Sequence, residues 1–125
     1  MKCIHTDKAP AAIGPYSQAM AVGKLLFTSG QIPIDPATGE VVEGDVKVQA
    51  EQVMKNLGEV LSAGGSSYAG AVKTTCFLAD MGDFGAFNEV YGRYFTGKPA
   101  RSCVAVKTLP KGVLCEVEVI AEVEE

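Results

Sequence analysis

The chain has 125 residues, of which 47% are hydrophobic and 21% charged, and its formal net charge at pH 7 is −4. A chain of this length typically buries about 65–70% of its unfolded surface, so we expect one domain over residues 1–125 that needs no disulfide or metal to hold its core. The 11 lysines and arginines are scattered rather than clustered, which argues against nucleic-acid binding.

Cysteine usage and hydropathy indicate the cellular setting. The four cysteines form no CxxC pair and there is one histidine, so the sequence lacks the ligand spacing of a zinc site. No apolar run approaches the length of a membrane span, and the N-terminus lacks the apolar core of a signal peptide. Free thiols without a secretion signal favour a reducing compartment, so we expect a cytoplasmic protein that holds no metal.

The N-terminal third of the sequence predicts short strands separated by turns. Residues 2–6 are expected to form a strand, and Gln18–Val22 and Leu25–Ser29 a hairpin around a glycine-containing turn. Prolines make the segment between the first strand and the hairpin irregular. Residues 30–43 are expected to form a loop, because prolines and glycines interrupt them and residues 35–39 have turn chemistry.

Two amphipathic helices are predicted, one on each side of a strand. The first begins after Asp45, a typical capping residue, and ends at Gly64-Gly65; apolar residues recur every three or four positions between them. The second is expected to be capped by Asp83 and to end before Gly97, with an aromatic face. The segment between the helices, Ala71–Ala79, is β-branched and apolar, which is typical of a strand buried on both faces or nearly so.

Two strands are predicted after the second helix, Arg101–Thr108 and Val113–Val123, joined by a turn at Leu109–Gly112. Side chains alternate between the two faces of a strand. One face of the last strand is apolar and suits a helix-covered side: Cys115, Val117, Val119, Ala121 and Val123. The opposite face is mixed: Leu114, Glu116, Glu118, Ile120 and Glu122. The order of elements indicates an α+β fold with both helices on one face of the sheet, so the other face must meet solvent or another subunit.

Arg101 and Glu116 are the candidate chemical residues on these strands. The planar fork of Arg101 can hold a carboxylate through two charge-assisted bonds worth about 1.5–3 kcal/mol each. The commoner role of such an arginine is a surface ion pair, here with Glu116 or Glu118. If Glu116 is desolvated, its pKa rises and it can exchange a proton near neutral pH; the alternative is a glutamate on a wet face.

Three loop or strand residues could contribute to a pocket. Cys103 is expected on the same face as Arg101, whose charge could lower the pKa of its thiol, although a small buried hydrophobe is the commoner role of a free cysteine. Tyr16 and Ser29 lie in loops, where their hydroxyls could close a pocket or satisfy local backbone groups. The SGQIP segment around Gly30 does not join a strand to a helix, so phosphate binding is not indicated.

Several segments together resemble the RidA/YjgF family. They are GPYSQA at residues 14–19, SGQIP at 29–33, PARSCV at 99–104, LPK at 109–111 and EVE at 116–118. The combination of PARSCV, the LPK turn and the glutamate strand is specific, and the resemblance covers essentially the whole chain. Members of this family are called reactive-intermediate deaminases, with L-PSP endoribonuclease and translation inhibitor as older labels.

The resemblance implies a fold, an assembly and an activity. The fold would be chorismate-mutase-like and α+β, related to the ferredoxin-like sheet, in a homotrimer whose helix-free faces form a central core with ligand clefts between subunits. The activity would be hydrolysis of 2-imino and 2-enamino acids, such as 2-aminoacrylate and 2-iminobutyrate, to 2-oxo acids and ammonia. No cofactor is implied.

The resemblance also implies roles for individual residues. Arg101 would hold the substrate carboxylate, and Glu116 would position the attacking water. The other residues that would contribute to the cleft are Tyr16, Ser29, Gly30, Asn88 and, through its backbone N–H, Cys103.

Two other functions stay open. One is an endoribonuclease or translation inhibitor, as the older labels say, although the sequence offers no basic patch and no histidine pair. The other is a non-enzymatic module that binds 2-oxo acids or acts as a chaperone, because a fold does not by itself fix a function.

Overall fold

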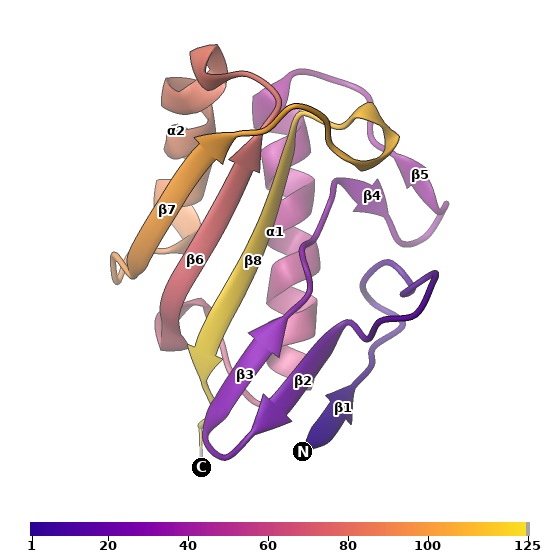
Figure 1. Cartoon of the computed structure of the whole chain (residues 1–125), viewed down its shortest axis with the longest axis vertical. Coiled ribbons are helices and arrows are strands. Elements are labelled where there is room, and N and C mark those ends of the chain that lie inside the picture. The colour runs from indigo at the N-terminus through magenta and orange to yellow at the C-terminus, as the bar shows by residue number, and fades with distance from the viewer. Residues whose placement is uncertain (125) are drawn as a thin grey trace.

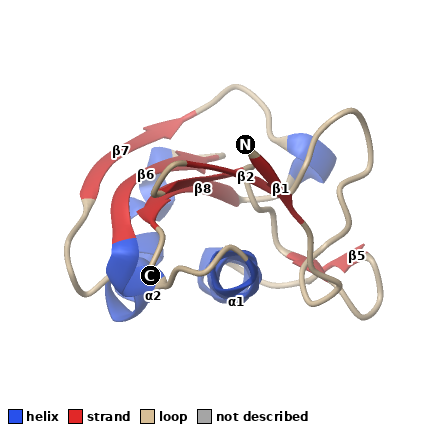
Figure 2. Cartoon of the chain, turned by 90° about the horizontal axis from the view of Figure 1, so that it is seen from below, coloured by secondary structure: helices blue, strands red, loops and turns tan. Residues whose placement is uncertain are grey.

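The computed structural model describes residues 1–124 as a mixed β-sheet with two helices packed on one face (Figures 1 and 2). Its strand order is β1-β2-β3-β8-β6-β7. These strands are Lys2–Ile4 (β1), Ala19–Val22 (β2), Leu25–Thr28 (β3), Ala71–Leu78 (β6), Ala100–Ala105 (β7) and Cys115–Glu122 (β8). All neighbouring pairs are antiparallel except β6 and β7, which are parallel. The predicted α+β fold with both helices on one face is confirmed.

The two helices differ in how they begin. Helix α1 (Val46–Ala63) starts as predicted, because the side chain of Asp45 accepts a hydrogen bond from the Val48 N–H at 3.1 Å. Helix α2 (Phe84–Tyr94) does follow Asp83, but the predicted side-chain cap is wrong. Asp83 already has helical backbone angles, so its carboxylate is not placed to accept from the first turn. Asp80 instead accepts from the Gly82 N–H at 2.7 Å and shapes the 3-10 turn Met81–Asp83 that leads into the helix.

The core lies between the helices and the sheet. The apolar stripe of α1, including Val53, Leu57 and Leu61, is fully buried against the apolar face of β8. Burying each such side chain contributes about 1.5–3 kcal/mol. The predicted division of the last strand is confirmed, because its residues from Cys115 to Ala121 alternate between buried and half-buried. No helix in residues 1–124 is long and apolar enough to cross a membrane.

Several predicted boundaries are wrong. The expected loop at 30–43 contains a small hairpin, β4 (Ile34–Asp35) and β5 (Glu40–Val41), built on the turn at 35–39. Strand β7 ends at Ala105 instead of Thr108, because it pairs only with β6 and the last register pair joins Leu78 to Ala105.

Strand β6 was also expected to be buried on both faces, and it is buried on one. Thr74, Cys76 and Leu78 are buried beneath the helices, whereas Lys73, Thr75 and Phe77 on the other face are only half-buried. Both helices lie on the same side of the sheet, so no helix layer covers the other face (Figure 2).

The helix-free face carries a set of exposed apolar side chains. They are Val22, Leu25, Phe27 and Val104, each between 38% and 48% exposed. They come from three strands of one sheet rather than from scattered loops. Apolar side chains gathered on one face of a sheet are typical of an interaction surface rather than of a wetted one.

Candidate functional site

Arg101 lies on the edge strand β7, and its side chain turns toward helix α2. Its guanidinium donates a hydrogen bond to Asn88 Oδ1 at 2.7 Å. The guanidinium carbon lies 4.7 Å from the centre of the Tyr91 ring and 5.4 Å from that of Phe84. Cation–π contacts of this kind hold a cation without neutralising it. The alternative of an ion pair with Glu116 or Glu118 is wrong: within residues 1–124 Arg101 forms no ion pair.

A hollow of about 350 Å³ opens beside Arg101, between α2 and the segment that leads into β7. Its lining includes Asn88, Tyr91, Lys98 and Arg101 and no acidic side chain. Lys98 has a left-handed backbone (φ 53°), a conformation that costs a non-glycine residue about 1–3 kcal/mol. Two cations without an acidic neighbour make this hollow suited to an anion.

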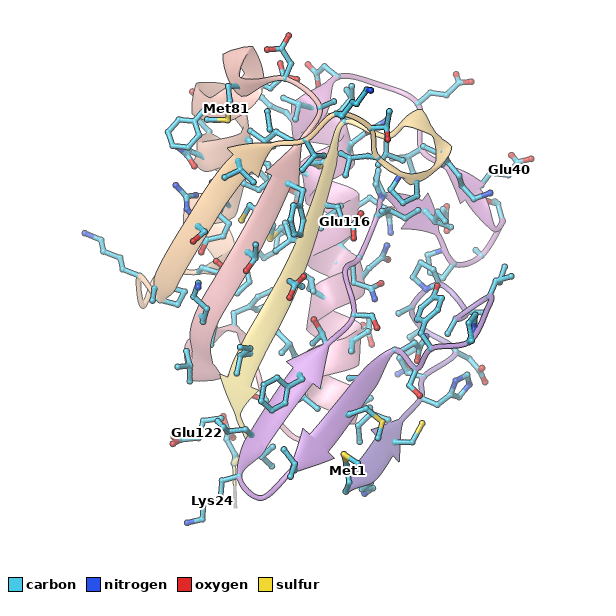
Figure 3. The ribbon with its side chains drawn as sticks, in the orientation of Figure 1. Met1, Lys24, Glu40, Met81, Glu116 and Glu122 are labelled. Atoms are coloured by element: carbon cyan, nitrogen blue, oxygen red, sulfur yellow. The ribbon has the colours of Figure 1, made fainter. Side chains whose placement is uncertain are left out.

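Glu116 lies on β8 on the helix-free face (Figure 3). Partial burial raises the pKa of its carboxyl group, and the charge of Glu118 raises it further. A carboxylate with a raised pKa is a stronger proton acceptor, which brings general acid–base chemistry closer to neutral pH.

Gly30 makes room for this carboxylate. After β3 the backbone of Gln31 pairs with Val117 through two hydrogen bonds, of 2.8 and 3.2 Å, which places Gly30 beside Glu116. A Cβ atom at Gly30 would lie 2.9 Å from the carboxyl carbon of Glu116 and closer still to Oε2. A side chain at residue 30 and the observed position of Glu116 therefore exclude one another.

Tyr16 and Ser29 have different places near Glu116. The Ser29 hydroxyl donates to the Ser17 carbonyl at 2.6 Å, which ties the Tyr16 loop to the end of β3. The ring of Tyr16 lines a hollow of about 500 Å³ together with Gly30 and Glu116. Ser29 does not line that hollow. Its hydroxyl therefore satisfies a local backbone group, the second of the two roles considered for it.

The rest of this hollow is mostly apolar. Its other walls are Ala11, Ile13, Ile32, Ile34, Pro110 and Lys111. Asn56 of α1 fixes the segment that contains Ile32 and Ile34. Its side-chain amide donates hydrogen bonds to the carbonyls of these two residues, at 3.1 and 2.9 Å. Lys111 has a left-handed backbone (φ 56°) in the turn before β8.

Cys103 shares the helix-covered face with Arg101, as predicted, and packs partly buried against the core. Of the two roles considered for Cys103, the small, partly buried hydrophobe is the one observed. Burial raises the pKa of the Cys103 thiol, and the Arg101 charge opposes this only in part.

The candidate residues therefore form two groups on opposite faces of the sheet. Strand β6 gives the reason: Cys76 pairs with Cys103, and its neighbour Phe77 pairs with Glu116. Adjacent strand residues point to opposite faces, so their partners do too. Arg101, Asn88 and Cys103 form one half-site, which we call the arginine half. The glutamate half on the other face contains Tyr16, Gly30 and Glu116.

Sequence reasoning missed the side chains that hold Arg101. The sequence predicts an aromatic face for the second helix, and the structure shows that two residues of it, Phe84 and Tyr91, also contact the guanidinium. The signal was present in the spacing: Phe84, Asn88 and Tyr91 follow at four and three residues and so share a helix face. Lys98 and Lys111 were also missed, because their positions depend on turn conformations. Within residues 1–124 no group of three potential ligands could hold a metal.

The sequence is similar to those of known proteins over almost its entire length. Residues 6–123 match the family described as endoribonuclease L-PSP. Protein DfrA of Myxococcus xanthus is 58% identical over 123 residues, covering 96% of this chain and 94% of that protein. The 2-iminobutanoate/2-iminopropanoate deaminase of mouse is 52% identical over 121 residues, covering 96% of this chain and 90% of that protein.

Solved structures share the fold. A putative endoribonuclease from Thermotoga maritima has a TM-score of 0.97 and 52% identity, covering 100% of this chain and 99% of its own. The RidA protein of an Antarctic Psychrobacter has a TM-score of 0.94 and 44% identity, covering 98% and 100%. Escherichia coli TdcF with bound serine has a TM-score of 0.93 and 44% identity, covering 99% and 100%.

Replacing Gly30 by Ala should displace the Glu116 side chain, because the new methyl group would overlap the carboxyl group. We expect the free energy of unfolding in urea to fall by about 1–3 kcal/mol, and the carboxyl resonance of Glu116 to shift. Gly85→Ala is the matched control, since no atom lies within 4 Å of a Cβ atom there. An unchanged Glu116 resonance and unchanged stability in Gly30→Ala would contradict this geometry.

Replacing Glu118 by Gln should lower the pKa of Glu116, because it removes the negative charge that disfavours ionisation of Glu116. Burial remains, so the pKa should still lie above the usual value. A carboxyl-carbon NMR titration measures this directly. Glu122→Gln, on the same face of β8 but farther along, serves as the control. An equal shift in both variants would mean that the neighbouring charge is not the cause.

Proposed function

This chain belongs to the RidA/YjgF family, the family described as endoribonuclease L-PSP, and on that premise we propose that it hydrolyses 2-imino and 2-enamino acids to 2-oxo acids and ammonia. Relatives from mouse and rat that are 52% identical carry the name 2-iminobutanoate/2-iminopropanoate deaminase. The observation that carries the proposal is Arg101, a cation held by an amide and two rings, to which residues 1–124 provide no ionic partner. We place the activity in the cytoplasm, because all four thiols are free.

Arg101 supplies the binding energy for the substrate carboxylate. The guanidinium can donate two parallel charge-assisted bonds, each worth about 1.5–3 kcal/mol. Asn88 and the two aromatic rings fix its orientation before substrate arrives, so little side-chain freedom is lost on binding. The protein as a whole is acidic, so attraction for an anionic substrate must arise locally.

Glu116 serves as the proton carrier. A protonated imine carbon is a strong electrophile, so the enzyme needs chiefly to orient it and deliver water. Glu116 accepts a proton from the water that attacks this carbon and returns a proton to the departing nitrogen. The balance is one iminium acid and one water giving one 2-oxo acid and one ammonium ion. The group returns to its carboxylate form after each turnover.

The two half-sites act together only if a second copy of the chain joins them. Arg101 and Glu116 lie on opposite faces of one sheet, which a single small substrate cannot bridge. We propose a homotrimer in which the glutamate half of one copy meets the arginine half of its neighbour. The exposed apolar side chains of the helix-free face support this assembly, since they provide an apolar surface for another copy.

Arg101→Ala should lower kcat/KM for 2-iminobutyrate by about 10²–10⁴, the equivalent of two lost charge-assisted bonds. Arg101→Lys should also lose most activity, because an ammonium group cannot reproduce the bidentate fork. The substrate is generated by a threonine dehydratase, and its decay and ammonia release are followed. Arg93→Ala, which removes an exposed arginine paired with Glu51, is the matched control and should keep full activity.

Retained turnover in Arg101→Ala would overturn the assigned role. Binding of 2-oxobutyrate by the wild-type protein without imine hydrolysis would overturn the enzymatic proposal and favour a binding module. RNA cleavage that survives repurification and is lost in Arg101→Ala would favour the older endoribonuclease label.

A mixing experiment tests the shared cleft. Arg101→Ala and Glu116→Gln chains are each expected to be inactive alone. Co-expressed in equal amounts they should regain about a quarter of the wild-type activity, because one cleft in four combines an intact arginine half with an intact glutamate half from its neighbour. Complete inactivity of mixed oligomers, verified by native mass spectrometry, would contradict a site built from two copies.

A further inference from the structure

Two cysteines face each other across the edge of the sheet. Cys76 on β6 and Cys103 on β7 are register partners in the parallel pair. Both point toward the helices; Cys76 is fully buried, and Cys103 is partly exposed. Neighbouring strands lie about 4.7–4.9 Å apart, which falls within the Cα separation of about 4.4–6.8 Å that a disulfide spans. A bond between these residues therefore needs no change of register.

The two thiols interact and differ in reactivity. Burial raises the pKa of Cys76 to about 12, and Cys103 adds to this shift. Burial also raises the pKa of Cys103, but the Arg101 charge and a hydrogen bond from Cys76 lower it in part. Of these two thiols, Cys103 is the partly exposed one that an oxidant meets first. Cys76 is the protected thiol directly behind it.

We propose that Cys76 and Cys103 are a redox modification site, which a peroxide converts into an intrachain disulfide that disables the arginine half. The sulfur of Cys103 attacks one peroxide oxygen, the O–O bond breaks, and Cys103 becomes a sulfenic acid with release of one water. The sulfur of Cys76 then attacks the sulfenic sulfur, the S–O bond breaks, and a second water leaves. Two thiols and one hydrogen peroxide give one disulfide and two waters, so the thiols are oxidised and the peroxide is reduced.

The bond acts on Arg101 through the edge strand. A disulfide requires Cβ atoms about 3.5–4.5 Å apart, so β7 must be drawn toward β6 at Cys103. Strand β7 pairs only with β6 and is free to move on its other side. Arg101 lies two residues from Cys103 on the same face of β7. It contacts Asn88 and Tyr91, which belong to helix α2, so a shift of β7 moves Arg101 away from these partners. The loss of carboxylate binding rests on the proposed function, whereas the disulfide itself does not.

Cys115 provides a matched comparison. It is buried on the same side of the sheet, but its register partner on β6 is Leu78, so it is diagonal to Cys76. Diagonal cross-strand neighbours lie about 7–8 Å apart, beyond the reach of a disulfide. Among these three thiols, only Cys76 and Cys103 lie opposite one another in register, so only this pair can be joined without a change of register.

The test treats the whole reduced protein with hydrogen peroxide and measures peptide masses after digestion without reductant. In wild type and Cys115→Ala the peptides containing Cys76 and Cys103 should be joined, with a loss of about 2 Da that dithiothreitol reverses; the exposed Cys3 is oxidised separately. Cys76→Ala should gain oxygen on Cys103 instead of losing hydrogen. Because the peptide map uses the wild-type chain, a misfolded variant leaves the test intact.

Imine turnover separates the two claims. Peroxide should abolish turnover reversibly in wild type and in Cys115→Ala. Cys76→Ala cannot form the cross-link, so any turnover that it loses must come from oxidation of Cys103 alone. Four free thiols after treatment, or a link through Cys115 or between chains, would overturn the modification site. A complete disulfide with unchanged turnover would overturn its effect on Arg101. If the reduced protein shows no turnover, the proposed function fails while the mass result still decides the disulfide.

Discussion

The alternation of side chains across a single sheet governs the rest of this molecule. Two helices can cover one face, and every strand that contributes a buried residue to that face sends the next residue to the other. On β8 this rule buries Val117 and leaves Glu116 on the helix-free side. On β7 it turns Arg101 and Cys103 toward α2. The chemistry of the two half-sites is consequently different: Arg101 lies against aromatic rings in one, and Glu116 lies among mostly apolar walls in the other.

The loops of the glutamate half are fixed by buried polar side chains that act on the backbone. Gln18 accepts from the Thr6 N–H at 2.7 Å and donates to the Thr6 and Pro10 carbonyls at 3.0 and 2.8 Å, which fixes the irregular N-terminal segment next to the hairpin. Asn56 performs the same task for the wall around Ile34. Buried amides satisfied in this way specify one conformation of a loop that has few apolar contacts. The loops that surround Glu116 are therefore positioned by side chains of the core.

The sequence was sufficient for what depends on periodicity and local chemistry. The apolar repeats predicted both helices, Asp45 predicted the start of α1, and alternation predicted the two faces of β8. It was insufficient where the outcome depends on pairing partners. The end of β7 is set by the end of β6, and the role of Asp83 by a turn that Asp80 organises. The separation of Arg101 from Glu116 likewise follows from sheet register, which no single strand encodes.

Arg101 lies on the edge strand, where a substrate can reach it. Aromatic rings rather than a carboxylate hold its guanidinium in place. An acidic partner on α2 would have bound the guanidinium permanently, and a substrate carboxylate would have had to displace it. Asn88, Phe84 and Tyr91 orient the guanidinium but occupy fewer of its N–H donors than a carboxylate would. On the proposed assembly, the negative charge of Glu116 reaches this cation only across a subunit boundary. Ligand binding, proton transfer and oligomer formation then depend on one another, because no isolated copy contains both charges on one face.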